Sequence, residues 1–419
     1  MTGMVIQDAS ARIAGADDAE AFVASTCFKT GPPRLLGVEL EWFVHDTRNP
    51  RIPLTTDRLA AALGPHAPAT LAAGRPALPL PGGSAVTVEP GGQVEISSPP
   101  ADTLSDCLAL ASDDLAALAA RLRPGHLVLQ GTGVDRHRPP NRLLTLPRYA
   151  AMESHFDRTG GAGRLMMCST ASVQVSVDVG IDPAHRWRLL HRLGPVLVAM
   201  FADSAVHAGV LTDWRSTRQA IWSRVDPSRT GTPDITRDPR EAYARYALDA
   251  GLLCCRRSPD CWDAPAGLTF RDWLNGAFGP PPTYDDLAYH LTTLFPPVRA
   301  QGHLEVRYLD QQSGDNWQVA TAVVAALVGD ADAADLASAA AEPAAGRWEQ
   351  AARCALADPV LDRAARAVAV VARSALVRHG ASAELLDVVN RFFETYTDRG
   401  RCPADDDLDP RRTPERRRM

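Results

Sequence analysis

The sequence predicts an α+β fold, an antiparallel sheet with helices packed outside it. Two observations support this prediction. Several segments alternate apolar with polar residues, as expected for an antiparallel sheet with one wet face. Beyond Asp315 the chain is rich in alanine, which predicts helices to about Thr397. A chain of 419 residues can form two average domains or one large domain with helical additions.

The first strand follows a short lead-in. Residues 1–34 are Ala-rich and polar, and we expect a short helix there. From Leu35 apolar residues alternate with Glu39 and Glu41, so both carboxylates should lie on one face of a strand. A helix over Thr56–Leu63 and then loop should follow.

A second polar strand is expected at Gln93–Ser97, directly after the turn Glu89–Gly92. Asp102 or Thr103 should then cap an amphipathic helix that ends near Gly125, because Thr103 and Asp106 have capping-box spacing. Residues His126–Val134 have the pattern of another strand.

The clearest strand is Ser172–Val179, with its valines on one face and Gln174, Ser176 and Asp178 on the other. A helix from about Pro183 to His207 and an irregular Arg-rich segment over Arg215–Thr236 should follow. The alternation returns in His303–Tyr308.

The boundaries expected from these patterns are a lead-in over 1–34, a single catalytic domain over 35–397 and a tail over 398–419. The domain should end in Ala-rich helices over about 319–397. The tail alternates acidic and basic blocks with proline, which is typical of disorder.

Composition excludes several classes of protein. The net charge of −6 provides no basic field for nucleic acid. No apolar run is long enough to span a membrane, and the N-terminus lacks the pattern of a signal peptide, so we expect a cytoplasmic protein. The 8 cysteines complete no zinc motif. Lys29 is the only lysine, so any phosphate or carboxylate clamp must use arginine.

The polar faces of the strands carry the candidate chemistry. A solvated sheet face is the ordinary explanation for one such strand. Carboxylates recur on several strands, however, and clustered carboxylates repel one another unless a cation neutralises them. Such oxygen-rich sites suit Mg²⁺ or Mn²⁺ with phosphate-bearing substrates. The sequence therefore predicts a metal–nucleotide site, with ligands from Glu39, Glu41, Glu95, Glu305 and, before the Pro-Gly-Gly turn, Glu89.

No P-loop or Rossmann glycine motif is present to bind the nucleotide. The glycine-rich stretch Thr159–Arg164 is weak evidence by itself and is better explained as a flexible loop. The arginines of the irregular segment fit either carboxylate and phosphate recognition or a solvated loop; they are Arg215, Arg218, Arg224 and Arg229.

Together these motifs resemble the glutamate–cysteine ligase family, most closely its plant-type branch and the actinobacterial relatives in ergothioneine biosynthesis. The resemblance covers roughly residues 35–330. It rests on Gly37–Glu41, Glu89–Ser97, Ser172–Asp178, Arg218–Trp222, Asp226–Gly231, Thr269–Trp273, His290–Pro296 and Leu304–Arg307, in family order.

The resemblance implies a glutamine-synthetase-like catalytic fold, in which a curved antiparallel sheet forms a funnel with helices outside. By the family pattern, the acids named above match metal ligands, with Glu305 and Arg307 in catalytic positions. Gln174 and Arg307 match the ATP side. Arg218 matches the residue that holds the glutamate α-carboxylate, with Trp222 and Arg229 in the same substrate segment. Ser176 departs from the Asn usual in plant-type members.

The implied reaction is ATP- and Mg²⁺-dependent ligation of the glutamate γ-carboxylate to the cysteine amine through γ-glutamyl phosphate. No nucleic acid or membrane partner is implied, and the oligomeric state is left open. Two alternatives stay open as well. One is ligation to another amine or phosphorylation of a guanidino substrate by the same fold. The other is a nucleotide- or amino-acid-binding regulator without catalysis.

Overall fold

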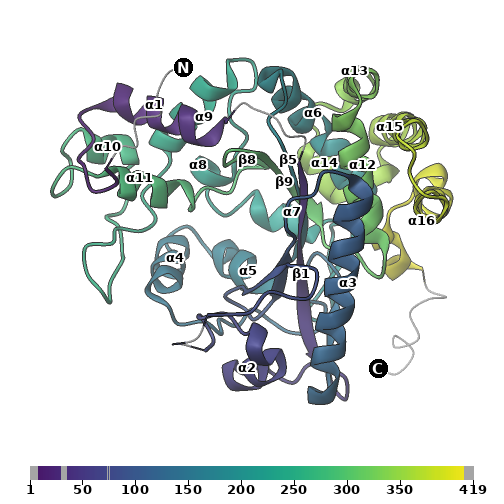
Figure 1. Ribbon diagram of the computed structural model, residues 1–419, viewed down its shortest axis with the longest axis horizontal. Helices are drawn as coiled ribbons and strands as arrows, with labels where there is room; N and C mark the ends of the chain where they lie inside the picture. Colours follow the sequence, from purple (N-terminus) through teal and green to yellow (C-terminus); the bar gives the residue numbers. More distant parts are fainter. Residues whose placement is uncertain (1–7, 30–34, 73, 75, 410–419) are drawn as a thin grey trace.

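The computed structural model describes residues 8–29, 35–72, 74 and 76–409. Its centre is a seven-stranded sheet in the order β2-β3-β1-β5-β9-β8, with β4 paired to β1, and every pairing is antiparallel. Figure 1 shows this open sheet with helices on both sides. The strands are β1 (Leu36–Asp46), β2 (Ala85–Val88), β3 (Val94–Ser97), β4 (Leu127–Gln130), β5 (Ser172–Val177), β8 (Val298–Ala300) and β9 (Leu304–Asp310). The predicted α+β class with an antiparallel sheet is confirmed.

The register brings the predicted polar residues of separate strands into one row. Glu39 of β1 lies opposite Ser97 of β3 on one side and Gln174 of β5 on the other. Glu41 lies opposite Glu95 of β3. Farther across the sheet, β9 pairs with β5 and with β8. Residues far apart in sequence therefore share one polar face.

Apolar residues on the opposite face form the core with a layer of helices. These helices are α3 (Leu104–Leu122), α6 (Pro183–Phe201) and α12 (Asn316–Gly329). The predicted Thr103 cap of α3 is present, with its hydroxyl accepting from Asp106 N. Ala-rich helices pack outside this layer: α13 (Ala331–Ala341), α14 (Trp348–Cys354), α15 (Pro359–Arg378) and α16 (Ala383–Thr395).

The polar face of the sheet is covered by a second group of helices. Figure 1 shows α4, α5 and α8 on the side of the sheet opposite α3. The chain outside the core layer forms α1 (Ala16–Cys27), α2 (Thr56–Leu63), α4 (Pro147–Asp157), α5 (Ala162–Ser169), α7 (Thr217–Trp222), α8 (Pro227–Thr230), α9 (Pro239–Asp249), α10 (Phe270–Leu274) and α11 (Tyr284–Leu291), and a hairpin of β6 (Val206–His207) and β7 (Val210–Leu211). Among the described residues, none of the helices has the length and apolar character that a membrane crossing requires.

The segment predicted to be a disordered tail is structured over 398–409. It forms two short 3₁₀ helices, Thr397–Arg399 and Pro403–Leu408, and buries Cys402. Asp407 pairs with Arg136, and Asp405 pairs with Arg215 at 2.6 Å. These long-range ion pairs have no local sequence signal, which explains the wrong prediction. The rest of the predicted tail, 410–419, lies outside the described residues.

Two other segments differ from expectation. The strand predicted over His126–Val134 is limited to β4, and the irregular segment over Arg215–Thr236 contains α7 and α8. Each of these short helices begins at a polar cap, Ser216 for α7 and Asp226 for α8, whose side chain accepts a backbone N–H. Such caps order a segment that has no apolar periodicity.

Candidate functional site

Three of the predicted metal ligands form a cluster on the polar face of the sheet. Glu41 comes from β1, Glu95 from the neighbouring β3, and Glu89 from the turn that joins β2 to β3. One carboxylate oxygen from each lies within 4.8 Å of the others. This spacing fits a single cation that takes one oxygen from each residue.

The turn between β2 and β3 positions Glu89. Its backbone N–H donates to the Gln93 carbonyl, and its carbonyl accepts from Gly92 N, both at 2.8 Å. Gly92 has φ of 89°, which favours glycine. A Cβ on Gly91 would lie 2.4 Å from the carbonyl oxygen of Cys168, so this position also requires glycine. The Pro-Gly-Gly sequence thus holds Glu89 beside the strand that carries Glu95.

Burial and mutual repulsion raise the pKa of the clustered carboxyls. Burial is the main cause at Glu95, followed by the charge of Glu41, and its pKa rises to about 7. Burial and the charge of Glu95 raise the pKa of Glu89 to about 8. Glu39 lies on the same face, and burial together with Glu305 and Glu95 raises its pKa to about 9. A bound cation would stabilise the ionised form of these carboxyl groups and so lower their pKa values.

The protein's own donors satisfy only part of this cluster. Ser172 donates to Glu41 at 2.8 Å, and Gln174 donates to the other Glu41 oxygen at 3.2 Å. Thr87 donates to Glu95 at 2.6 Å. Over the described ranges, no basic side chain forms an ion pair with Glu39, Glu41, Glu89 or Glu95. The donor set therefore fits a hard divalent cation that prefers oxygen ligands.

Glu305, at the far end of the same polar row, has the opposite environment. Arg299 of β8 donates to both of its oxygens, at 2.7 and 3.1 Å, and Arg307 of β9 donates at 2.9 Å. Burial alone would raise the pKa of Glu305, but the two guanidinium groups hold it well below its ordinary value. Glu305 is therefore an ionised carboxylate between two arginines.

Arg307 links this ion pair to the rest of the site. One of its terminal nitrogens donates to Glu305 and also to the side-chain oxygen of Gln174. Gln174 in turn donates to Glu41, so Arg307 and the acid cluster are connected through one amide. The Arg307 Nε is buried and has no hydrogen-bond partner. This unpaired donor suits an anionic substrate group.

Arg218 of α7 is a second buried guanidinium with unused donors. Only 2% of its surface is exposed, and one terminal nitrogen donates to the Arg307 carbonyl at 2.7 Å. Its Nε and other terminal nitrogen have no partner, and burial lowers its pKa. The ring of Trp222 lies 5.4 Å from Arg218 and 5.9 Å from Arg307. The indole therefore packs against both arginines.

The guanidinium of Arg229, predicted to bind substrate, is occupied by protein groups. Its side chain is 0% exposed and donates to Asp226 and to the carbonyls of Thr293 and Gly251. Its own carbonyl accepts from Phe295 N at 2.8 Å. All three of its guanidinium nitrogens thus bind protein atoms, and Arg229 fixes the loop that carries Phe295.

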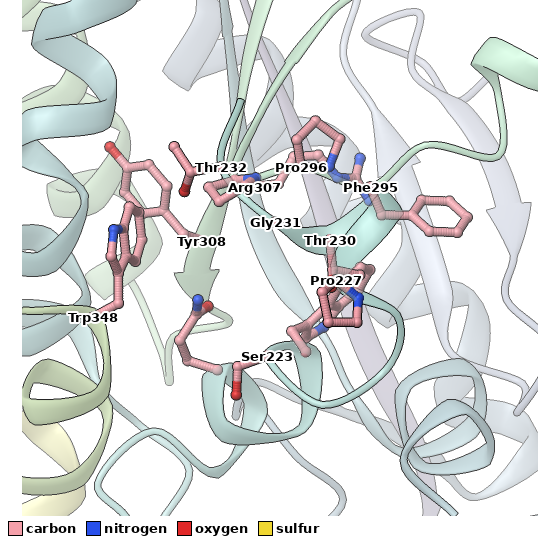
Figure 2. Close-up of a pocket in the computed structure, with 13 residues that line it drawn as sticks. Ser223, Pro227, Thr230, Gly231, Thr232, Phe295, Pro296, Arg307, Tyr308 and Trp348 are labelled. Carbon is pink, nitrogen blue, oxygen red and sulfur yellow. The ribbon is translucent and has the colours of Figure 1, made fainter. Parts of the chain in front are cut away.

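A cavity of about 180 Å³ adjoins Trp222 and Arg307. Figure 2 shows Phe295 and Thr230 on one side of it and Tyr308 and Trp348 on the other. Arg307 lines this cavity, so a space of small-molecule size lies next to one arginine of the site.

Sequence reasoning missed several residues of the site. Arg299 belongs to a strand of only 3 residues, too short for a clear alternation. Thr87 and Ser172 were overlooked because single hydroxyls are common on any strand. Alternation could have indicated both hydroxyls, because Thr87 and Ser172 each lie on the polar face of a strand beside a predicted acid.

Comparison with known proteins identifies the family of this chain. Residues 35–418 match the model of glutamate–cysteine ligase family 2. The chain is 38% identical over 399 residues to the glutamate–cysteine ligase EgtA of Mycobacterium tuberculosis H37Rv, covering 92% of this chain and 88% of that protein. Identity to the EgtA of Mycolicibacterium smegmatis is 39% over 401 residues, covering 93% and 90%. The chloroplastic glutamate–cysteine ligase of Nicotiana tabacum is 32% identical over 59% of this chain and 49% of its own.

A solved glutamate–cysteine ligase of Francisella tularensis, in complex with AMP, has the same fold. It superposes with a TM-score of 0.52 at 13% identity, over 91% of this chain and 85% of that chain. The matched family model spans both the acid cluster and the two arginines, and the mycobacterial relatives cover nearly the whole chain. This chain belongs to glutamate–cysteine ligase family 2.

Proposed function

We propose that this protein is an ATP-dependent ligase that joins the γ-carboxylate of glutamate to the amine of cysteine, giving γ-glutamylcysteine. The observation that supports it most strongly is the combination of an acid cluster that, within the described residues, forms no ion pair with a basic side chain and two buried arginines that have unused donors. A ligase of this kind must bind both a metal–nucleotide and an amino-acid carboxylate.

The acid cluster is the proposed Mg²⁺ site, with Glu41, Glu89 and Glu95 as ligands. Bound Mg²⁺ would neutralise the charge that develops on ATP phosphates during phosphoryl transfer. Glu39 is a further proposed ligand, because it lies on the same face and its raised pKa reflects the same excess of negative charge. A metal role for Glu305 is also a prediction, although both of its oxygens accept from arginine.

Arg307 is the proposed phosphate contact. Its charge is held in place by Glu305 on one side and oriented by Gln174 on the other. Gln174 also reaches Glu41, which places this amide between the proposed metal and phosphate positions. An ionised Glu305 therefore helps catalysis by fixing the guanidinium and offsetting the cost of burying its charge.

Arg218 is the proposed contact of the glutamate α-carboxylate. Its Nε and one terminal nitrogen have no partner among the described residues, so each can donate a hydrogen bond to an anionic substrate oxygen. Trp222 fixes the separation of Arg218 and Arg307 by packing against both. Arg229 supports this site by holding the Phe295 loop at the edge of the cavity.

The reaction then needs no nucleophile from the enzyme. The glutamate γ-carboxylate attacks the γ-phosphorus of ATP, giving γ-glutamyl phosphate and ADP. The neutral amine of cysteine attacks the acyl carbon, the bond to phosphate breaks, and an amide forms as the nitrogen loses a proton to solvent. Arg307 and Arg218 position the reactants, which is the main protein contribution to phosphoryl transfer.

The test is ADP release by the purified protein with ATP, Mg²⁺ and glutamate, with and without cysteine, and identification of the product by mass. Cysteine-dependent ADP release with γ-glutamylcysteine as product is expected. ADP release only with another amine or a guanidino acceptor would overturn the substrate assignment and keep the fold and metal site. A folded protein that releases no ADP with any acceptor would indicate a binding protein.

The pathway is a separate proposal. By likeness to the actinobacterial relatives, the product should supply ergothioneine biosynthesis in the cytoplasm. Deletion of the gene should then deplete cellular ergothioneine, and added γ-glutamylcysteine should restore it. Unchanged ergothioneine in the deletion strain would contradict this assignment.

A further inference from the structure

A buried carboxylate outside the metal cluster lies beneath the proposed glutamate site. Asp310 is the last residue of β9 and is 2% exposed. A Cβ on Gly133 would lie 2.5 Å from its Cγ, so the carboxylate is packed without spare room. Neither the metal site nor the phosphate contact uses this residue.

Asp310 binds the segment that carries Arg218 through two serine hydroxyls. Ser204 donates to one carboxylate oxygen at 2.6 Å, and the Asp203 N–H donates to the same oxygen at 3.0 Å. Ser216 donates to the other oxygen at 2.8 Å. All of these donors are buried, so their hydrogen bonds are sheltered from water.

Each serine hydroxyl also accepts a hydrogen bond from the backbone of α7. The Ser204 hydroxyl accepts from the backbone N–H of Arg218 at 3.2 Å. The Ser216 hydroxyl caps the helix by accepting from Gln219 N at 3.1 Å. The backbone on both sides of the arginine is therefore tied to a single carboxylate.

The same arrangement keeps the Arg218 guanidinium available. Burial lowers the pKa of Arg218 and raises the pKa of Asp310, and the charge of each residue opposes the shift of the other. They form no direct ion pair, because the carboxylate takes its hydrogen bonds from the serines and a backbone N–H. A direct salt bridge would occupy the donors that a substrate carboxylate needs.

We propose that Asp310, acting through Ser204 and Ser216, is a positioning residue that neutralises and aims Arg218 without occupying the donors that bind the glutamate α-carboxylate. This inference rests on the proposed function of Arg218. It predicts that loss of Asp310 weakens glutamate binding selectively, because Asp310 touches neither the metal cluster nor Arg307.

The experiment compares Asp310→Asn with Arg218→Lys and with the double variant. Asp310→Asn should raise the KM for glutamate about tenfold, equivalent to about 1.4 kcal/mol, with KM for ATP and cysteine nearly unchanged. In the Arg218→Lys background the same change should have little further effect, because it acts through the arginine. Asp46→Asn is the matched control: it is a buried strand-end aspartate paired with Arg48 and Arg58, away from α7.

Three results would overturn the inference. If Arg218→Lys raises the KM for glutamate and Asp310→Asn does not, the positioning role falls and the proposed function stands. If Asp310→Asn raises all three KM values alike and lowers the Tm, its role is structural only. If Arg218→Lys leaves the KM for glutamate unchanged, the proposed glutamate contact itself is wrong. Should Asp310→Asn not fold, Ser204→Ala and Ser216→Ala carry the same test, since each removes one link.

Discussion

The two ends of the polar sheet face hold buried carboxylates in opposite electrostatic states. At the β2–β3–β1 end, Glu95 and Glu89 repel each other and have raised pKa values of about 7 and 8. At the β8–β9 end, Glu305 lies between Arg299 and Arg307, which lower its pKa. Glu305 is 1% exposed and Glu95 is 9% exposed, so burial cannot explain the lowered pKa of Glu305, and the neighbouring arginines decide the difference. The protein's own arginines neutralise one end, and the other end is the proposed cation site.

The largest expected effect comes from removing a ligand at the acid end. Glu95→Gln keeps the shape of the side chain and removes its charge, so Mg²⁺ affinity and activity should fall, activity by about a thousandfold. Steady-state ADP release at varied Mg²⁺ measures this. Glu153→Gln is the control for loss of a carboxylate, because Glu153 of α4 forms ion pairs with Arg142 and Arg164. Full activity in Glu95→Gln at ordinary Mg²⁺ would remove the acid end from the mechanism.

A smaller loss is expected at the arginine end. Arg307→Lys keeps a positive charge, but one ammonium group cannot bind Glu305, Gln174 and an incoming phosphate at the same time. The kcat should therefore fall about a hundredfold. Arg299→Lys is the comparison variant, because Arg299 contacts Glu305 and not Gln174. It should lose less activity. Equal losses in both variants would mean that neutralising Glu305 is the only task of either arginine.

Mg²⁺ binding should also change stability at one end only. A ligand at a hundred times its Kd stabilises the folded state by about 2.7 kcal/mol. Thermal unfolding with MgCl₂, against NaCl of equal ionic strength, should show this gain in the wild type and in Arg299→Lys. The gain should be absent in Glu95→Gln. An equal gain in that variant would place the ion elsewhere.

The two ends predict opposite responses of stability to pH. The raised pKa values of Glu95, Glu89 and Glu39, about 7, 8 and 9, mean that the folded metal-free protein holds more protons than the unfolded chain above the ordinary value of 4.5. Stability should therefore decrease as pH rises through these values. Glu305 has a lowered pKa, so its contribution is present above 4.5 and is lost at lower pH.

Urea unfolding in EDTA between about pH 5.5 and 8.5 measures the first response. The free energy of unfolding should fall with rising pH, and the slope should be shallower in Glu95→Gln or with Mg²⁺ present. A metal-free protein whose stability rises across this range would contradict the raised pKa values.

The acid end of the polar face could be predicted from the sequence, but the pairing of Glu305 with arginine at the other end could not. Alternation with a period of two placed Glu39, Glu41 and Glu95 on polar faces, and the antiparallel register then brought them together. The resemblance to a known family supplied the roles of Arg218 and Arg307. The pairing of Glu305 with Arg299 depends on a β8–β9 register that a strand of 3 residues does not reveal.

Contacts between distant segments were the hardest to predict. The link from Asp310 to Arg218 runs through two serines that are 106 and 94 residues away from the aspartate in the sequence. The C-terminal segment was predicted to be disordered because its charges alternate, yet Asp405 and Asp407 find arginine partners far back in the chain. Local pattern gives the element and its face, whereas ion pairs of this kind require the whole fold.

The most direct test of the account is proton release on Mg²⁺ binding. Calorimetric titration of the metal-free protein at pH 7, in two buffers of different ionisation enthalpy, counts the protons displaced. Because the acid end holds protons at this pH, the wild type should release about one proton or more per bound ion, and Glu95→Gln should release fewer or none. Mg²⁺ binding with no proton release, or the same release from Glu95→Gln, would contradict the claim that these carboxylates form the metal site.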